Sequence, residues 1–292
     1  MALSLYLETH TLAFILLSSL VGLTVGSFLN VVIHRTPILL LRQWQRECQE
    51  PTDTHTKTDE TYNLILPGSH CPQCGHAIRA WENIPVISFL WLKGKCAHCR
   101  APISARYPLV EILSAVVSAV VAWHFGYGYA AGAVMLLSWA LIALTFIDVD
   151  HQLLPDAITL PFLWLGLLLN SFDLLPYKGL TSAVVGAAAG YLSLWLVFHI
   201  FKLITGKDGM GYGDFKLFAL FGAWLGWQML PVIILLASLT GAVVGLTFIL
   251  YAGRDRHLPI PFGPFLCAAG WVAALWGNDI LSLYLQFAKL SA

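Results

Sequence analysis

Long runs of apolar residues alternate with short polar segments along most of the chain. Eight of these runs come near the length of about 20 residues that an α-helix needs to cross a hydrocarbon core of roughly 30 Å. They cover residues 12–33, 108–125, 130–147, 158–172, 180–201, 215–230, 232–251 and 260–276. The fourth and the last runs are short, which leaves seven or eight spans. The pattern predicts an all-α polytopic membrane protein with about eight transmembrane helices.

Composition agrees with this fold class. Hydrophobic residues make up 58% of the chain and charged residues only 11%, and the mean hydropathy is +0.73. Soluble domains have about a quarter of their residues charged. The net charge is zero, so we expect membrane lipid around the helices and no nucleic-acid partner.

The first run predicts the orientation of the chain. Residues 1–11 contain no Lys or Arg, and the run exceeds the roughly 7–15 apolar residues of a signal peptide, so we expect it to be retained. An N-terminus outside the cell places every Lys and Arg except Lys178 and Lys289 on the cytoplasmic side, as the positive-inside rule favours. Residues 34–107 then form a cytoplasmic loop.

This loop contains two Cys-x-x-Cys pairs, Cys71 with Cys74 and Cys96 with Cys99. Four thiolates with this spacing are typical of a tetrahedral structural zinc site. Two disulfides are the alternative, which a reducing cytoplasm disfavours, and a nearby histidine is a possible substitute ligand. Because four cysteines leave no open coordination position, we expect zinc to stabilise the loop and not to catalyse a reaction.

Two acidic residues lie at the ends of apolar runs. Asp148 closes the third run, and Asp214 opens the sixth within the sequence Gly211-Tyr-Gly213-Asp214. Carboxylates at the membrane edge are costly and usually functional. When two share a site, one holds a proton while the other activates water. The two glycines would let a substrate strand approach the backbone. The pattern predicts an aspartic protease.

Helix ends suggest how the two aspartates divide these roles. Asp214 precedes the sixth run, at the positive end of a helix dipole, and Asp148 follows the third run, at the negative end. We therefore expect Asp214 to be the resting base and Asp148 the resting acid.

Several motifs in order resemble the bacterial type IV prepilin peptidases. They are the two Cys-x-x-Cys pairs, GSFLNVVIHR at 26–35, WENIPVIS at 81–88, RYPLVE at 106–111, IDVDHQLLPD at 147–156 and GYGD at 211–214. The resemblance runs from about residue 22 to 275. It implies an enzyme of the inner membrane that cleaves the leader of type IV prepilins and type II secretion pseudopilins on the cytoplasmic side. It also implies that Asp148 and Asp214 are the catalytic pair.

The resemblance further implies a second activity, N-methylation of the new N-terminus with S-adenosylmethionine. It assigns this activity to residues 1–107, around Gly94 and Lys95, and the peptidase to residues 108–292. Glu82 and Glu111 are further candidates for holding the sulfonium or the amine. The residues themselves show no Gly-x-Gly-x-x-Gly fingerprint that would indicate a nucleotide fold.

Two other functions fit parts of the pattern. An ion-coupled transporter would use Glu111, Asp148 and Asp214 as a relay, although the acids gather near one membrane face and no inverted repeat is visible. A zinc-loop scaffold for pilus assembly would explain the cysteines but not the two aspartates.

Overall fold

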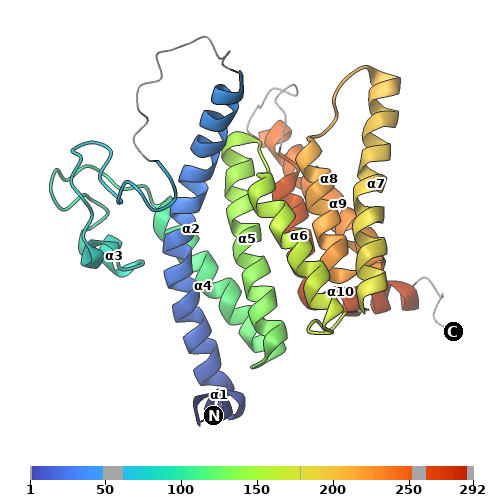
Figure 1. Cartoon of the computed structure of the whole chain (residues 1–292), viewed down its shortest axis with the longest axis horizontal. Helices are drawn as coiled ribbons and strands as arrows, with labels where there is room; N and C mark the ends of the chain where they lie inside the picture. The colour runs from blue at the N-terminus through green and yellow to red at the C-terminus, as the bar shows by residue number, and fades with distance from the viewer. Residues whose placement is uncertain (1, 49–61, 178, 252–260, 288–292) are drawn as a thin grey trace. The chain divides into compact units, whose positions relative to one another are not determined.

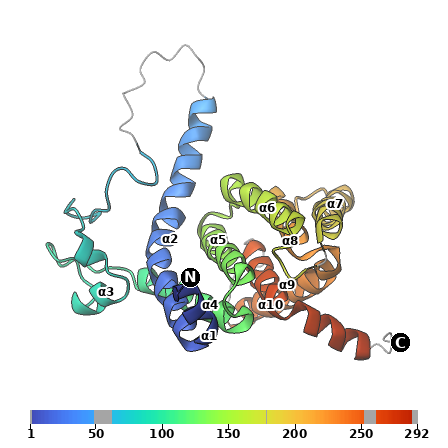
Figure 2. The same cartoon turned by 60° about the horizontal axis from the view of Figure 1, so that its bottom comes forward.

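The computed structural model describes residues 2–48, 62–177, 179–251 and 261–287. These residues form two compact units, Met1–Gly128 (unit 1) and Tyr129–Ala292 (unit 2), whose helices are labelled in Figures 1 and 2. Within the described residues, extended structure is limited to two isolated bridges, His70 with Ala77 and Lys95 with Pro102. The predicted all-α class is confirmed.

Unit 1 is built around two long helices and a loop between them. Its elements are α1 (Ala2–Thr9), α2 (Thr11–Cys48), the 3-10 turn η1 (Ala80–Asn83), α3 (Ile87–Trp91) and α4 (Arg106–Phe125). Glycines let α2 and α4 approach closely, since a Cβ at Gly22 would lie 2.6 Å from Ser118 Oγ and one at Gly26 would lie 2.6 Å from the Cα of Glu111. The 38 residues of α2 span about 57 Å, well beyond a 30 Å hydrocarbon core.

Unit 2 is a helical bundle with a short helix at its centre. Its elements are α5 (Tyr129–His151), α6 (Asp156–Ser171), α7 (Gly179–Thr205), α8 (Tyr212–Leu225), η2 (Trp227–Met229), α9 (Leu230–Tyr251) and α10 (Gly263–Phe287). Helix α8 packs on α6, α7 and α10. From Leu217 to Leu225 its residues are apolar all round, as expected of a helix enclosed by others.

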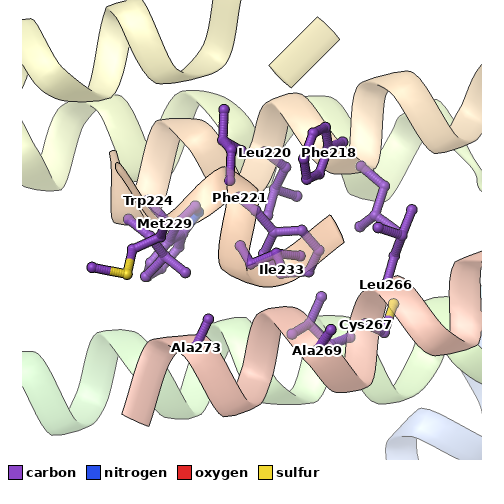
Figure 3. Close-up of a cluster of buried hydrophobic side chains, with 14 of the residues drawn as sticks. Phe218, Leu220, Phe221, Trp224, Met229, Ile233, Leu266, Cys267, Ala269 and Ala273 are labelled. Atoms are coloured by element: carbon purple, nitrogen blue, oxygen red, sulfur yellow. The ribbon is translucent and has the colours of Figure 1, made fainter. Parts of the chain in front are cut away.

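The core of unit 2 lies where α8 meets its neighbours. Figure 3 shows the side chains of Phe221 and Ile233 facing Ala269 and Ala273 of α10. Phe221 is fully buried, and its ring occupies the space that a Cβ at Gly270 would take. This close packing fixes the position of α8, and with it the acidic residue at its start.

Each of the eight predicted runs lies largely in a helix of the part of the chain that the structure describes. Six helices among the described residues are long and apolar enough to cross a membrane, so the chain is a multi-pass membrane protein. The fourth run forms α6, a short helix of 16 residues. The last run lies in α10, a helix of 25 residues that continues beyond the run through polar residues. Helix α8 has only 14 residues, and the surrounding helices cover it in place of lipid.

The compact N-terminal unit extends to Gly128, because α4 packs along α2. The assignment of methyl transfer to residues 1–107 and of proteolysis to residues 108–292 concerns activity, and it stays a prediction.

Candidate functional site

Asp148 occupies the last turn of α5 and is only 5% exposed. Its Oδ2 atom is buried and makes no hydrogen bond to any residue that the structure describes. The start of α10 lies beside this oxygen, since a Cβ at Gly263 would lie 2.5 Å from it. A buried carboxylate oxygen without a partner costs free energy, which is typical of a functional group.

Asp214 is the third residue of α8 and is 6% exposed. Its Oδ2 accepts a hydrogen bond of 3.2 Å from the backbone N–H of Gly211. Gly211 adopts an extended conformation just before the helix. The local sequence therefore places the carboxylate at the N-terminal end of α8, where backbone N–H groups favour a negative charge.

The structure brings Asp148 and Asp214 together within unit 2. Both carboxylates lie beside the same short segment, which contains Leu154. Leu154 connects their surroundings, because a Cβ at Gly213 would lie 2.7 Å from its Cβ and one at Gly263 would lie 3.3 Å from its Cδ2. A side chain at either glycine would therefore displace Leu154, which lies in the chain between Asp148 and Asp214.

Sequence reasoning missed Gly263. The available signal was Pro261-Phe-Gly263-Pro264 at the start of the last apolar run, where a glycine between prolines indicates a special backbone position. The start of α10 also faces Asp148, so this carboxylate lies between the C-terminal end of α5 and the N-terminal end of α10. The assignment of Asp214 as the resting base and Asp148 as the resting acid stays a prediction.

Two other aspartates in unit 2 have ordinary ion pairs. Lys216 Nζ donates to both carboxylate oxygens of Asp156 at 2.7 Å, which ties α8 to the start of α6. Lys202 Nζ lies 2.9 Å from Asp208 Oδ1 on the surface. These pairs give Asp156 and Asp208 a structural explanation that Asp148 lacks.

The four cysteines of unit 1 form one cluster. Their sulfur atoms all lie within 4.8 Å of one another, and Cys71 Sγ is 3.8 Å from Cys99 Sγ. A tetrahedral zinc with bonds of about 2.3 Å places its sulfurs about 3.8 Å apart, whereas a disulfide is about 2.05 Å long. All six cysteines are free thiols. The donor set therefore fits a metal ion, and the disulfide alternative does not fit.

The cluster is made by two knuckles with the same backbone pattern. In the first, Cys71 N–H donates to His76 O and Gly75 N–H donates to Cys71 O. In the second, Cys96 N–H donates to Ala101 O and Arg100 N–H donates to Cys96 O. The backbone N–H groups of Cys74 and Gln73 lower the pKa of the Cys71 thiol to about 7, which favours the thiolate that a metal requires.

The methyltransferase candidates surround α3. Glu111 Oε2 accepts a hydrogen bond of 2.8 Å from Val86 N–H, immediately before α3. Glu82 accepts one of 3.0 Å from Arg79 N–H, which lowers its pKa. After α3, a Cβ at Gly94 would lie 3.1 Å from the ring of Phe89. Lys95 is exposed.

Arg35 is a second residue that sequence reasoning missed. Its guanidinium is buried and donates to Asn63 O at 2.9 Å and to Pro67 O at 2.6 Å. It also lies 5.6 Å from the ring centre of Tyr62. These bonds hold the start of the cysteine loop against α2. Its position in the GSFLNVVIHR motif could have indicated this role. A single Arg at the end of a span is, however, also typical of the basic residues that set the orientation of a membrane protein.

Comparison with known proteins gives matches along most of the chain. Residues 20–125 match the family model of the bacterial peptidase A24 N-terminal domain, and residues 135–246 match that of the type IV leader peptidase family. No solved structure matches the chain.

Several curated proteins are similar over nearly their full length. The prepilin leader peptidase/N-methyltransferase of Pseudomonas aeruginosa is 56% identical over 284 residues, covering 97% of both chains. The proteins of that name from Stutzerimonas stutzeri and Legionella pneumophila are 55% and 46% identical, covering 98% and 93% of this chain and 98% and 94% of their own. With the matches of both halves, these relatives show that the chain belongs to the type IV leader peptidase family.

Proposed function

We propose that this protein cleaves the leader peptide of type IV prepilins and type II secretion pseudopilins and then N-methylates the new N-terminus. The observation that carries the peptidase is the pair of buried carboxylates, with the unpartnered Oδ2 of Asp148 beside Asp214. Membership of the family and the names of the relatives support both activities.

The two aspartates can perform amide hydrolysis without further groups. One carboxylate takes a proton from a water molecule as the water oxygen attacks the carbonyl carbon of the scissile amide. The other, in its protonated form, donates a hydrogen bond to the carbonyl oxygen. The C–N bond then breaks as the leaving amine takes the proton that the first carboxylate accepted from water. Of the two glycines expected to admit the substrate backbone, Gly211 is exposed and is the proposed approach surface, whereas Leu154 packs where Gly213 lacks a Cβ.

Methyl transfer needs different chemistry. S-adenosylmethionine supplies a methyl group on a sulfonium, and the acceptor amine must be deprotonated and aligned with it. We assign this step to the surroundings of α3 in unit 1. Here Glu82 and Glu111 are already held by backbone N–H donors, and we assign to them, with Gly94 and Lys95, the binding of the sulfonium or the amine.

We assign zinc to the four-cysteine cluster. The distances between the sulfurs match a tetrahedral site, and the loop around them has almost no buried apolar side chain of its own. Metal binding would therefore supply folding free energy to the loop and take no part in either reaction. We place this loop and the aspartate pair on the cytoplasmic side of the bacterial inner membrane, with the N-terminus outside, because this orientation leaves only two cations outside.

One assay tests both activities. The purified full chain is incubated in lipid nanodiscs with a prepilin and isotope-labelled S-adenosylmethionine, and the product is weighed by mass spectrometry. We expect loss of the leader and gain of one labelled methyl group. An intact prepilin with a well-folded enzyme would contradict the peptidase, and would return the transporter and the scaffold to consideration.

A variant separates the two sites. Asp214→Asn should not cleave prepilin but should still methylate a pilin supplied without its leader, because methyl transfer makes no use of an aspartate pair. If the variant binds zinc normally yet transfers no methyl group to the cleaved pilin, one shared site performs both reactions and the division between units is wrong.

A further inference from the structure

One face of α3 is apolar and exposed within unit 1. Ile87, Leu90 and Trp91 have exposed fractions of 59%, 68% and 81%. Their spacing of three and four residues puts them on one side of the helix. The ring of Phe89 turns the other way and packs beside Gly94. Large apolar side chains gathered in this way mark a surface that binds something.

Contacts with α4 and α2 give the depth of α3 in the membrane. Val86 N–H donates to Glu111 of α4, and Glu111 lies at the level of Gly26 of α2. The apolar run of α2 continues to Ile33, seven residues or about 10 Å further along the axis. The start of α3 therefore lies at the level of the apolar part of α2. Figure 1 shows α3 level with the middle of α2, not beyond its end.

The backbone around α3 satisfies the requirement for contact with lipid. Lipid offers no hydrogen bonds, so N–H groups must find partners inside the protein. Val86 N–H has Glu111, and Ile87, Ser88 and Leu90 donate to backbone carbonyls of residues 84–86. The four N–H groups of residues 92–95, directly after the helix, also donate to carbonyls within this segment.

Charged residues follow the apolar face. Lys93 and Lys95 come directly after α3, and both are exposed. Trp81, before the helix, is 60% exposed, with the guanidinium of Arg79 lying 5.3 Å from its ring centre. Tryptophan beside basic residues is typical of a segment at the boundary between acyl chains and headgroups.

We propose that α3 inserts its apolar face into the bilayer interface, with Ile87, Leu90 and Trp91 among the acyl chains and Lys93 at anionic headgroups. The occupant of this face is lipid. The evidence for lipid over a protein partner is depth, because a surface at the level of Gly26 lies within the thickness of the membrane.

Site-specific photo-cross-linking tests the proposal on the full chain. Trp91 is replaced by benzoylphenylalanine, a tolerable change at so exposed a side chain, and the protein is reconstituted in nanodiscs of phosphatidylethanolamine and phosphatidylglycerol. After irradiation, adducts are identified by mass. We expect lipid adducts at residue 91. The matched controls are Leu239 on α9, exposed and apolar, which should also give lipid adducts, and Gln73 on the first cysteine knuckle, which should give none.

Three outcomes would overturn the proposal. Cross-links from residue 91 to residues 129–292 would show that unit 2 covers the face. Cross-links to another protein would show a partner. No adduct at residue 91, with adducts at residue 239, would show that the face is in water. The part played by Lys93 has its own readout: Lys93→Gln should lower the ratio of phosphatidylglycerol to phosphatidylethanolamine adducts, and an unchanged ratio would refute the role of its charge.

Discussion

The carboxylates of unit 2 and the thiols of unit 1 are positioned by different means. Asp148 and Asp214 lie at helix ends, and tightly packed helices and glycines without room for a Cβ hold them there. The four cysteines lie on short knuckles whose order comes from local backbone hydrogen bonds and, as we propose, from a metal. The first site depends on global packing, whereas the second depends on its own ligands.

This difference predicts how each site fails. In a packed site, a small change in volume displaces a reacting group while the fold survives, since interiors are dense and transmit strain. In a metal-held loop, removing one ligand releases the whole loop but leaves the helices intact. Variants that alter one site and spare the other therefore test the comparison directly.

The largest effect is expected from the aspartates themselves. Asp148→Asn or Asp214→Asn should lower the rate of prepilin cleavage by roughly 10²–10⁴-fold or more, because an amide neither accepts nor donates the required proton. Cleavage is measured by leader loss, and membrane insertion is checked separately. Asp173→Asn is the matched control: it lies in a turn with φ of 52°, which Asn tolerates, so activity should be unchanged. Full leader removal by either of the first two variants would exclude the aspartic mechanism.

Gly263→Ala tests whether packing positions Asp148. The new Cβ would lie 2.5 Å from Asp148 Oδ2, and a misplacement of about 1 Å can cost on the order of 10²-fold in rate. We expect kcat to fall by about this factor with little change in KM, because the substrate surface is untouched. Gly132→Ala on α5 is the control, since nothing lies within 4 Å of its added Cβ. Equal kcat in both variants would show that the close approach has no role.

Much of this arrangement could be predicted from the sequence. The apolar runs predicted helices α2 and α4–α10, and the motifs predicted Asp148 and Asp214 as site residues. Gly263 could not be found in this way, because its importance comes from a contact between α5 and α10 that no local pattern records. Arg35 was missed for a related reason. Its bonds reach Asn63 and Pro67 across a loop, while its local setting is that of any basic residue at the end of a span.

Cys71→Ser tests the other half of the comparison. The wild-type chain should contain one zinc per molecule by elemental analysis, and this variant should lose it, because three thiolates bind zinc far more weakly than four. Methyl transfer should fall further than cleavage, since the aspartates lie on helices that pack without the loop. Cys48→Ser is the control, an exposed thiol outside the cluster. Equal loss of both activities in the zinc-free variant would show that the loop supports the two sites equally.

The smallest effect concerns the two knuckles, which differ at one equivalent position. Gly75 has φ of 69° and Arg100 has φ of 61°, a region that costs a residue with a Cβ about 1–2 kcal/mol. Arg100→Gly should therefore stabilise its knuckle by up to about 1 kcal/mol, and Gly75→Ala should destabilise the other by a similar amount. In a competition against a chelator, a change of 1 kcal/mol appears as about a fivefold change in zinc affinity. The two variants should move this affinity in opposite directions while cleavage stays constant. If both weaken zinc binding, the side chain of Arg100 stabilises the knuckle more than its backbone conformation costs.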